Sequence, residues 1–433
     1  MKTIFAEATA PGKAGIAIIR ISGPLAGMAV EKLTAQPLPL PRRAILRNFA
    51  DIDRGLLLWF PGPNSFTGEN IAELHLHGSR AIVKEVLRFL SGITGLHLAE
   101  PGEFTRQAFE NDKLDLTAVE GLADLIAAET EQQRKQALRQ MEGELGRLYE
   151  SWRERLLQVM GFFEACLDFA DEDIPPDLEQ QAISTVRALI EEIAHHLDDD
   201  GRGEKIREGF YIAIIGSPNV GKSSLLNRLA KREAAIVSAT AGTTRDIIEV
   251  HLNIAGYPVI LADTAGLRES LDEIENEGIR RALQKAEMAD LKLIIFAADH
   301  KWDEIVRRRI DVNSLVIINK IDKAEFKELP SLNVPWLAIS AKKGEGIEPL
   351  WLELERQVLD RLSTSGQPLI TQLRHRLALQ DALAALQQAL LAPLSELTAE
   401  DIRLAARALG QITGRVNIEE VLDQIFAQFC IGK

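Results

Sequence analysis

The sequence contains few cysteines. Cys166 and Cys430 are the two in 433 residues, and they form no C-x-x-C pair. This count excludes a disulfide framework and favours a reducing compartment, so we expect a cytoplasmic protein. The N-terminus lacks a signal-type apolar stretch, and no run reaches the roughly 18 apolar residues that a membrane helix needs. We therefore expect no membrane association.

The chain also lacks an excess of positive charge. Lys and Arg number 50 against 64 Asp and Glu, which gives a net charge of −14. This balance argues against a broadly basic surface for nucleic acid, although it is compatible with a local basic patch or a positively charged partner. The length allows about two to four domains with sizeable cores.

A phosphate-binding pattern lies in the middle of the chain. Gly216-Ser-Pro-Asn-Val-Gly-Lys-Ser223 fits G-x-x-x-x-G-K-[ST]. It follows an expected strand, Phe210–Ile215, and precedes an expected helix, Ser224–Ala230. Glycines allow backbone N–H groups to wrap around phosphate oxygens, and the helix N-terminus adds its positive dipole end. We expect Lys222 to reach the β- and γ-phosphates and Ser223 to hold Mg²⁺.

Two later motifs predict which base is bound. Asn319-Lys-Ile-Asp322 follows the apolar run Leu315–Ile318. The Asp322 carboxylate can accept from the N1–H and the exocyclic amino group of guanine, whereas adenine offers no such pair of donors. Ser340-Ala-Lys342 follows the expected strand Val334–Ile339 and can offer a backbone N–H to the guanine carbonyl. The nucleotide is therefore predicted to be GTP.

Residues for the γ-phosphate side lie between these motifs. Asp263-Thr-Ala-Gly266 suits a magnesium-side aspartate with a γ-phosphate-sensing glycine, and Thr244 is the natural second Mg²⁺ ligand. Leu267 stands where a Ras-like GTPase carries a water-orienting glutamine, and Arg245 and Arg268 are candidates for an arginine finger. The expected GTP contacts are Asn219, Val220, Gly221, Lys222, Ser223, Ser224, Ser238, Ala239, Thr240, Ala241, Gly242, Thr243, Thr244, Asp263, Thr264, Ala265, Gly266, Asn319, Lys320, Asp322, Ser340, Ala341 and Lys342.

The N-terminal region reads as a mixture of strands, turns and helices. Strands are expected at Gly15–Ile21, Gly55–Phe60 and Ile71–His77. Alternation in the last strand places Glu73, His75 and His77 on one face. These side chains are possible metal ligands, but no fourth ligand is evident, so a solvated or ligand-facing polar side is the favoured interpretation.

Helical spacing begins at Asp115. Apolar residues recur at steps of three and four from Leu138 to Cys166, which predicts one long amphipathic helix in a bundle with Cys166 as a core thiol. A helix at Leu178–Leu197 is expected before a Gly- and charge-rich hinge, Asp198–Gly209. Further helices are expected at Leu377–Leu391 and Ile402–Leu409, followed by an apolar face formed by Ile418, Val421, Leu422, Ile425 and Phe429.

The predicted fold is multidomain and of mixed class. An N-terminal α+β domain covers residues 1–114, and a helical domain is divided between 115–209 and 363–433. A Ras-like P-loop GTPase domain of α/β class, 210–362, is inserted into the helical domain. Such insertion is tolerated when the ends of the inserted domain are close together.

Several motifs together resemble one family. Asn219-Val-Gly-Lys-Ser223, Ala241-Gly-Thr-Thr-Arg-Asp246 and the terminal Cys430-Ile-Gly-Lys433 are similar to those of the tRNA-modification GTPase family MnmE, also called TrmE. Further matches are Asp263-Thr-Ala-Gly-Leu-Arg268, Pro11-Gly-Lys-Ala-Gly15, Arg20-Ile-Ser-Gly23 and Asn111-Asp-Lys-Leu-Asp115, so the resemblance covers essentially the whole chain.

The resemblance implies a folate site in a dimerising N-terminal domain. By motif, the contacts to 5-formyltetrahydrofolate or a related folate fall on Arg20, Glu73, Lys113 and Lys433. Glu73 can accept from the pterin N–H groups, and the cations can bind the glutamyl tail.

The resemblance also implies that the GTPase domains pair in a homodimer and that K⁺ replaces an arginine finger. Its contacts map to Asn219, Ser238, Thr240 and Thr243, where Ser238-Ala-Thr240 replaces the family's more usual Thr-Asp-Ile. The water-orienting role maps to Glu275.

The implied partners are tRNA and the FAD-binding protein MnmG, also called GidA, in a heterotetramer or larger assembly. Together the two proteins would install a carboxymethylaminomethyl or aminomethyl group at C5 of the wobble uridine, with a folate one-carbon unit and the partner's flavin. Cys430 is either a nucleophilic or redox thiol in this reaction or an ordinary core cysteine.

Two other functions are compatible with the GTPase motifs. A ribosome-assembly GTPase would carry a basic RNA-binding module after the GTPase domain, whereas the segment after Pro368 is rich in Ala and Leu. A regulatory GTP-dependent scaffold would lack chemistry in the N-terminal domain, and a folate-binding assay would distinguish it.

Overall fold

The computed structural model describes residues 2–168, 176–231, 248–263, 287–323, 332–363, 366–416, 422, 425–427, 429 and 432. They form two compact units that alternate along the chain. The first unit contains the described residues of Met1–Ile126, Leu138–Ile193 and Leu377–Lys433, and the second those of Ala127–Ala137 and Ala194–Arg376. The second unit is thus inserted in the sequence of the first, as expected for the GTPase domain. The finer division into four domains stays a prediction.

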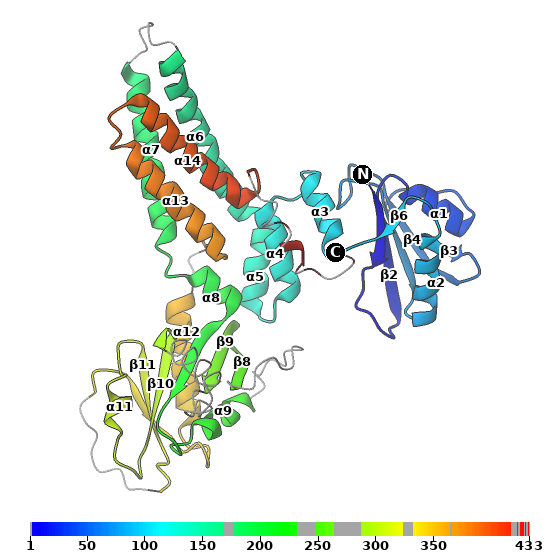
Figure 1. The fold of residues 1–433 in the computed structure, drawn as a ribbon. Helices are drawn as coiled ribbons and strands as arrows, with labels where there is room; N and C mark the ends of the chain where they lie inside the picture. Colours follow the sequence, from blue (N-terminus) through cyan, green and yellow to red (C-terminus); the bar gives the residue numbers. More distant parts are fainter. Residues whose placement is uncertain are drawn as a thin grey trace, which may run out of the picture. The chain divides into compact units, whose positions relative to one another are not determined.

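The N-terminal part of the first unit is built on a mixed six-stranded sheet with strand order β3-β4-β5-β2-β1-β6 (Figure 1). Its core lies between the sheet and two helices, whose residues Val30, Leu33, Val86 and Leu90 pack with Phe5 of the sheet. The elements are β1 (Thr3–Glu7), β2 (Ile16–Ser22), α1 (Ala26–Thr34), β3 (Ile45–Phe49), β4 (Asp53–Phe60), β5 (Ile71–His77), α2 (Arg80–Ser91) and β6 (Leu96–Leu98).

The three expected N-terminal strands correspond to β2, β4 and β5, whereas β1, β3 and β6 were not expected. In β5 the buried residues Ala72, Leu74 and Leu76 alternate with Glu73, His75 and His77. The predicted polar face is therefore confirmed. The register pairs Arg20 of β2 directly with Glu73 of β5.

Helices make up the rest of the first unit. α14 packs along α6, and α6 is tied to α7 by a 2.8 Å hydrogen bond from Trp152 Nε1 to Glu192 Oε2. Leu422, Ile425 and Phe429 of the expected last apolar face pack with Leu116 and Val119. The elements are α3 (Glu103–Glu110), α4 (Leu116–Ala127), α6 (Glu144–Asp168), α7 (Pro176–Leu197), α13 (Leu373–Ala389) and α14 (Ser395–Thr413). Helix α5 (Glu131–Met141) begins in the second unit and ends in the first.

Two helical predictions were wrong. The expected single helix from Leu138 to Cys166 is two helices, because Gly143 adopts φ 81° and ends α5 before α6 begins. The stretch Asp198–Gly209 contains the helix α8 (Arg202–Glu208) and is not simply a hinge. Arg376 stabilises α8 through 2.7 Å bonds to both carboxylate oxygens of Glu204, a contact from a distant part of the chain.

The second unit is organised around a sheet with strand order β12-β11-β10-β7-β9-β8, in which β8 alone is antiparallel to its neighbour. Its central strands, β7, β10 and β11, are buried on both faces and therefore read as apolar runs. The elements are β7 (Phe210–Ile215), α9 (Lys222–Ala230), β8 (Ile248–Ile254), β9 (Tyr257–Asp263), β10 (Leu291–Ala297), α11 (Glu304–Arg307), β11 (Ser314–Asn319), β12 (Trp336–Ala338) and α12 (Ile347–Leu362). This is the expected α/β GTPase architecture, and the predicted fold class is confirmed.

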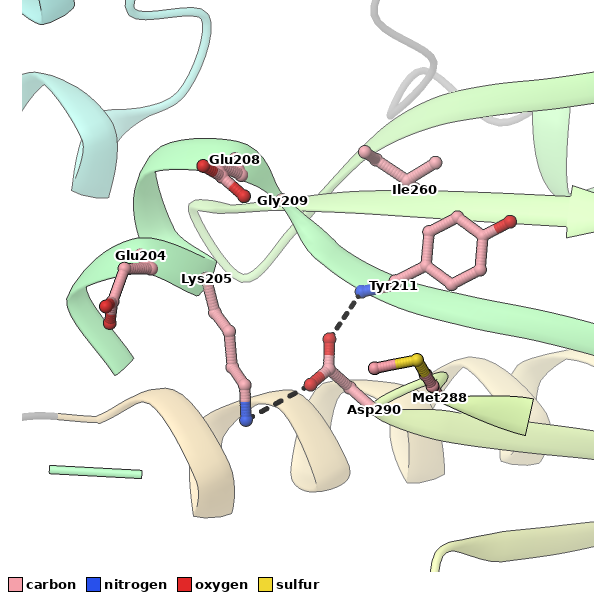
Figure 2. Close-up of a pocket in the computed structure, with 8 residues that line it drawn as sticks. All are labelled: Glu204, Lys205, Glu208, Gly209, Tyr211, Ile260, Met288 and Asp290. Atoms are coloured by element: carbon pink, nitrogen blue, oxygen red, sulfur yellow. Dashed lines mark hydrogen bonds and ion pairs between the residues drawn. The ribbon is translucent and has the colours of Figure 1, made fainter. Parts of the chain in front are cut away.

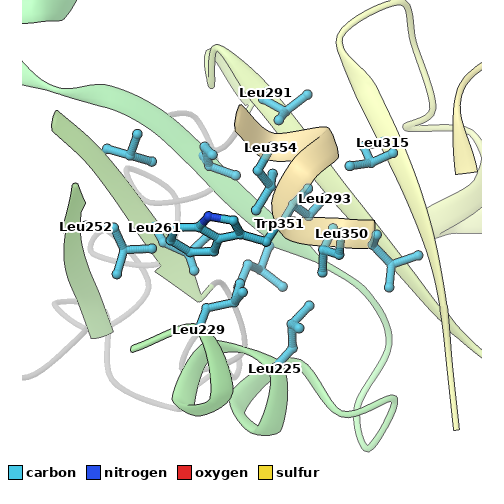
Figure 3. Packing of buried hydrophobic residues seen from close by; sticks show 14 of the residues in the cluster. Leu225, Leu229, Leu252, Leu261, Leu291, Leu293, Leu315, Leu350, Trp351 and Leu354 are labelled. Atoms are coloured by element: carbon cyan, nitrogen blue, oxygen red, sulfur yellow. The ribbon is translucent and has the colours of Figure 1, made fainter. Parts of the chain in front are cut away.

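The larger core of this unit lies between the sheet, α9 and α12. Figure 3 shows Leu350, Trp351 and Leu354 of α12 facing Leu261 of β9 and Leu293 of β10. The parallel strands all end at the same edge of the sheet, which is where ligands bind in such folds. Among the described residues, no helix combines the length and apolarity needed to cross a membrane.

The packing of α12 gives a stability prediction. We expect Leu350→Ala to destabilise the second unit by about 2–5 kcal/mol, because it leaves a cavity at a fully buried position. Hydrogen exchange of the β7 and β10 amides should accelerate accordingly. Leu352→Ala, on the same helix at a 57% exposed position, is the matched control and should change the stability by less than about 0.5 kcal/mol. Equal exchange rates in the two variants would contradict this account of the core.

Candidate functional site: a phosphate loop joined to a guanine pocket

The phosphate loop connects β7 to α9. Asn219 and Gly221 have φ 62° and 102°, values of the left-handed region in which glycine is least strained. A Cβ on Gly216 would lie 2.6 Å from the Ile295 carbonyl oxygen, and a Cβ on Gly221 would overlap Asn319 Nδ2. Close packing therefore requires both glycines, and the backbone conformation also favours glycine at position 221.

Lys222 and Ser223 begin the helix at the end of this loop. The buried Lys222 ammonium donates to the carbonyl oxygens of Gly216 at 2.6 Å and Ser217 at 2.8 Å, so it lies inside the loop. Burial lowers the pKa of Lys222, and the nearby Asp263 carboxylate opposes that shift. The negative charge of a triphosphate in the loop would stabilise the ammonium form of Lys222, as the Asp263 carboxylate does.

The Ser223 hydroxyl and the Asp263 carboxylate lie together at the ends of α9 and β9. Ser223 Oγ donates to Asp263 Oδ2 at 2.9 Å, and Asp263 is 3% exposed. A hydroxyl and a buried carboxylate are oxygen ligands of the kind that Mg²⁺ prefers, so the two side chains fit a magnesium ion.

Asn319 joins the phosphate loop to the third motif. At the end of β11, its buried Nδ2 donates to the Val220 carbonyl at 2.8 Å. Its Oδ1 accepts from the Ala341 N–H at 2.9 Å. One amide side chain thus connects two loops that are about 120 residues apart in the sequence.

Asp322 is held by a residue of the same loop that Asn319 contacts. The Ser340 hydroxyl donates to Asp322 Oδ1 at 2.7 Å, and this bond lowers the pKa of the carboxyl. The carboxylate form is the one that accepts from guanine. Lys320, with φ 66°, completes the motif, and its ammonium lies 3.4 Å from both carboxylate oxygens of Asp299.

A second cluster lies in the N-terminal sheet of the first unit. Arg20 donates to Glu73 Oε1 from Nε at 3.0 Å and from Nη2 at 2.9 Å, and Nη1 lies 3.5 Å from the Gly432 carbonyl. The guanidinium also lies 5.9 Å from the Phe66 ring and 5.8 Å from the Phe104 ring. The structure thus brings together two of the predicted folate residues and the neighbour of a third, Lys433.

Lys113 lies against the loop that follows β4, the same loop that carries Phe66. A Cβ on Gly68 would lie 3.2 Å from Lys113 Cε, so the lysine stem packs on this loop, two residues from Phe66. Asn111 Nδ2 donates to the Thr67 carbonyl at 2.7 Å and fixes the loop from the same side. The three described folate candidates therefore lie around one loop.

Comparison with known proteins identifies the family. A family model described as the MnmE helical domain matches residues 116–430, and one described as the GTP-binding protein TrmE N-terminus matches residues 3–113. The tRNA modification GTPase MnmE of Paramagnetospirillum magneticum is 53% identical over 440 residues, with all of both chains covered. The chain belongs to the MnmE family. The MnmE proteins of Parvibaculum lavamentivorans, at 52% identity, and Rickettsia rickettsii, at 46%, are also matched over the full length of both chains.

Some of the predicted MnmE site residues cannot be placed. Asn219, Val220, Gly221, Lys222, Ser223, Ser224, Asp263, Asn319, Lys320, Asp322, Ser340, Ala341 and Lys342 lie on the loops and strand ends described above. Ser238, Ala239, Thr240, Ala241, Gly242, Thr243, Thr244, Thr264, Ala265, Gly266, Glu275, Cys430 and Lys433 lie outside the described residues.

Three neighbours of the nucleotide site were not predicted from the MnmE-like motifs. Arg228 donates from α9 to the Ala341 carbonyl, and Asp303 accepts from the Ser217 hydroxyl at 2.8 Å while capping α11. Asp299 approaches Lys320. None of these three residues lies in a recognisable motif. Their position beside the predicted nucleotide residues is therefore evident only in the folded structure.

The predicted metal alternative on β5 gains no support. Glu73 binds Arg20, and His77 Nδ1 lies 2.8 Å from Asp53 Oδ1. Within the described parts of this MnmE-family chain, no three His, Cys, Asp or Glu side chains are grouped for a metal ion. The polar face is thus occupied by ion pairs.

A hollow of about 570 Å³ lies at the opposite end of β7 from the phosphate loop (Figure 2). Asp290 accepts from Tyr211 N at 2.9 Å and lies 3.1 Å from Lys205 Nζ, while Ile260 and Met288 form an apolar wall. Burial and the nearby Glu249 raise the pKa of Tyr211 to about 12, so its hydroxyl stays protonated. None of the predicted MnmE site residues lines this hollow.

The phosphate loop gives a direct test. We expect Gly221→Ala to weaken GDP binding by about 100-fold, because the new Cβ meets Asn319 and φ 102° is strained for alanine. Gly256→Ala is the matched control: φ is 86°, but the nearest atom to its Cβ is 3.7 Å away. Titration with a fluorescent GDP analogue should show normal affinity in the control. Normal affinity in Gly221→Ala would mean that the loop does not bind phosphate.

Proposed function

We propose that this chain binds and hydrolyses GTP and that it acts in the modification of tRNA. The relatives that match over the full chain are tRNA modification GTPases, which supports this assignment. The observation that carries it is the Asn319 side chain, which holds the phosphate loop and the Ser340–Lys342 loop in one pocket. Phosphate and base can therefore be recognised by one rigid site.

Guanine would be selected by the Asp322 carboxylate. Ionised Asp322, fixed by Ser340, accepts from the N1–H and the amino group of guanine. Adenine would leave this carboxylate without donors and would present its own amino group to backbone donors. These unpaired groups would make the binding of adenine less favourable than that of guanine.

Hydrolysis requires positive charge around the transferred phosphoryl group. Lys222 supplies one cation, and Mg²⁺ held by Ser223, Asp263 and Thr244 would neutralise charge on the β- and γ-phosphates. We propose that K⁺, bound by Asn219, Ser238, Thr240 and Thr243, takes the role of an arginine finger when two GTPase domains pair in a homodimer. Glu275 would orient the attacking water.

The tRNA reaction would use the N-terminal domain. We propose that Arg20, Glu73, Lys113 and Lys433 bind 5-formyltetrahydrofolate or a related folate as the source of the one-carbon unit. The FAD-binding partner MnmG would supply the redox step, and the product would be a wobble uridine with a carboxymethylaminomethyl or aminomethyl group at C5. Cys430, which lies outside the described residues, would be either a nucleophilic or redox thiol in this reaction or an ordinary core cysteine. The assembly would be cytoplasmic.

Folate could bind without breaking the Arg20–Glu73 ion pair. Both groups are about one-fifth exposed, so they are accessible and only partly desolvated. Glu73 Oε1 is shared by two Arg20 nitrogens, whereas Oε2 lies 3.6 Å from His75 Nε2. Oε2 can therefore accept from a pterin N–H while Arg20 continues to hold Oε1.

The nucleotide assignment is tested by Asp322→Asn. We expect GTP hydrolysis to fall by about 100-fold or more and XTP hydrolysis to appear, because asparagine can accept the N1–H of xanthine and donate to its 2-oxo group. Hydrolysis of GTP and XTP should be measured in KCl and in NaCl at equal ionic strength, and faster hydrolysis in KCl would support the K⁺ role. Asp360→Asn, on the surface of α12, is the control. Unchanged GTP hydrolysis in Asp322→Asn would refute the base assignment.

The folate assignment is tested by Arg20→Ala and Glu73→Ala. Each should raise the dissociation constant of 5-formyltetrahydrofolate by about 10- to 100-fold, because a charge-assisted bond is lost. His77→Ala changes an exposed residue on the same strand face and should leave the constant unchanged. Isothermal titration calorimetry gives the three values. If the unaltered protein bound no folate, a regulatory scaffold would become the better interpretation.

A further inference from the structure

Arg228 links the helix after the phosphate loop to the guanine loop. It lies on α9, six residues after Lys222, and donates from Nε to the Ala341 carbonyl at 3.1 Å. Nη2 donates to the Lys342 carbonyl at 2.7 Å. Two nitrogens on one edge of a planar guanidinium thus hold two successive carbonyls, an arrangement that a lysine ammonium cannot reproduce.

These bonds complete a ring of contacts around the pocket. Val220 in the phosphate loop accepts from Asn319, Asn319 accepts from the Ala341 N–H, and the Ala341 carbonyl accepts from Arg228. α9 closes the ring, because it begins at the phosphate loop and carries Arg228. The guanine loop is therefore fixed from both sides.

Among the backbone N–H groups of residues 340–344, one has no hydrogen-bond acceptor within the described residues. The Ala341 N–H is used by Asn319, and the Lys343 N–H donates to Ser340 Oγ at 3.1 Å. The N–H groups of Ser340 and Gly344 donate to the carbonyls of Glu345 and Ser340. The remaining N–H is that of Lys342.

The Lys342 N–H and the Ala341 carbonyl belong to the same peptide group. A trans peptide is planar and its N–H points opposite to its C=O. Because Arg228 binds the Ala341 oxygen, it also fixes the direction of the Lys342 N–H, which points away from α9. Gly344 allows this close approach, since a Cβ there would lie 3.1 Å from the Arg228 guanidinium.

We propose that Arg228 is a positioning residue for guanine specificity: by holding the Ala341–Lys342 peptide, it aims the Lys342 N–H at the guanine 6-oxo group. This inference rests on the proposed GTP binding. The N–H that reads the 6-oxo group belongs to the Ser340–Lys342 motif, but the residue that orients it, Arg228, lies outside the nucleotide motifs. Asp322 reads the N1–H and the amino group.

Binding of three nucleoside diphosphates to the purified full chain tests this role. We expect Arg228→Ala to raise the dissociation constants of GDP and IDP by the same factor, about tenfold, because both bases carry the 6-oxo acceptor. The constant for ADP should not change, since adenine has an amino group at that position. The preference for GDP over ADP should therefore fall about tenfold. Arg228→Lys, which keeps the charge but not the two-pronged contact, should show the same pattern to a smaller degree.

Lys231→Ala, at the exposed end of the same helix, is the matched control and should leave all three constants unchanged. If Arg228→Ala weakened GDP and ADP equally, Arg228 would only support α9 and the phosphate loop, and the proposal would be overturned. Unchanged GDP binding would also overturn it. Should Arg228→Ala fail to fold, the same comparison in Arg228→Lys decides. If the unaltered chain did not prefer GDP to ADP, the proposed GTP binding itself would fail.

Discussion

The nucleotide site depends on one buried amide side chain. Asn319 is 3% exposed, and both ends of its amide group are hydrogen-bonded, to the phosphate loop and to the guanine loop. An unpaired amide at this position would be costly, so the two loops and the strand end stabilise each other. Gly221 is part of the same constraint, since its missing side chain makes room for Asn319. The two loops are therefore held together by hydrogen bonds of the protein itself.

The sheet register imposes a similar constraint in the N-terminal domain. Arg20 and Glu73 face each other because β2 and β5 pair in a register that also buries Ile19, Ile21, Ala72 and Leu74 on the opposite face. A shift of either strand by one residue would turn its apolar side chains to the other face, so the apolar core fixes where the charged pair lies. Apolar packing thus determines the position of the Arg20–Glu73 pair, just as the buried strand β11 determines the position of Asn319.

Local patterns were sufficient where the physics is local. The glycines of the phosphate loop, the apolar strands before each motif and the alternation in β5 could be read from neighbouring residues, and all of them are confirmed. Predictions failed where a distant residue decides. α8, for example, is held by Arg376. The division of the helix at Gly143 has a local cause, but the apolar stripe continues across it and conceals the break. Arg228 and Asp303 carry no motif, because their partners come from separate segments of the chain.

The sequence alone determined the class of the second unit, the order of its nucleotide motifs and the family, because each depends on a short, ordered pattern of residues. The tertiary structure decided how those motifs meet. It showed that Asn319 binds both loops, that Arg20 binds Glu73, and that Arg228 binds the Ala341 and Lys342 carbonyls. These facts depend on strand order, register and side-chain packing between residues far apart in the chain, which no short pattern contains.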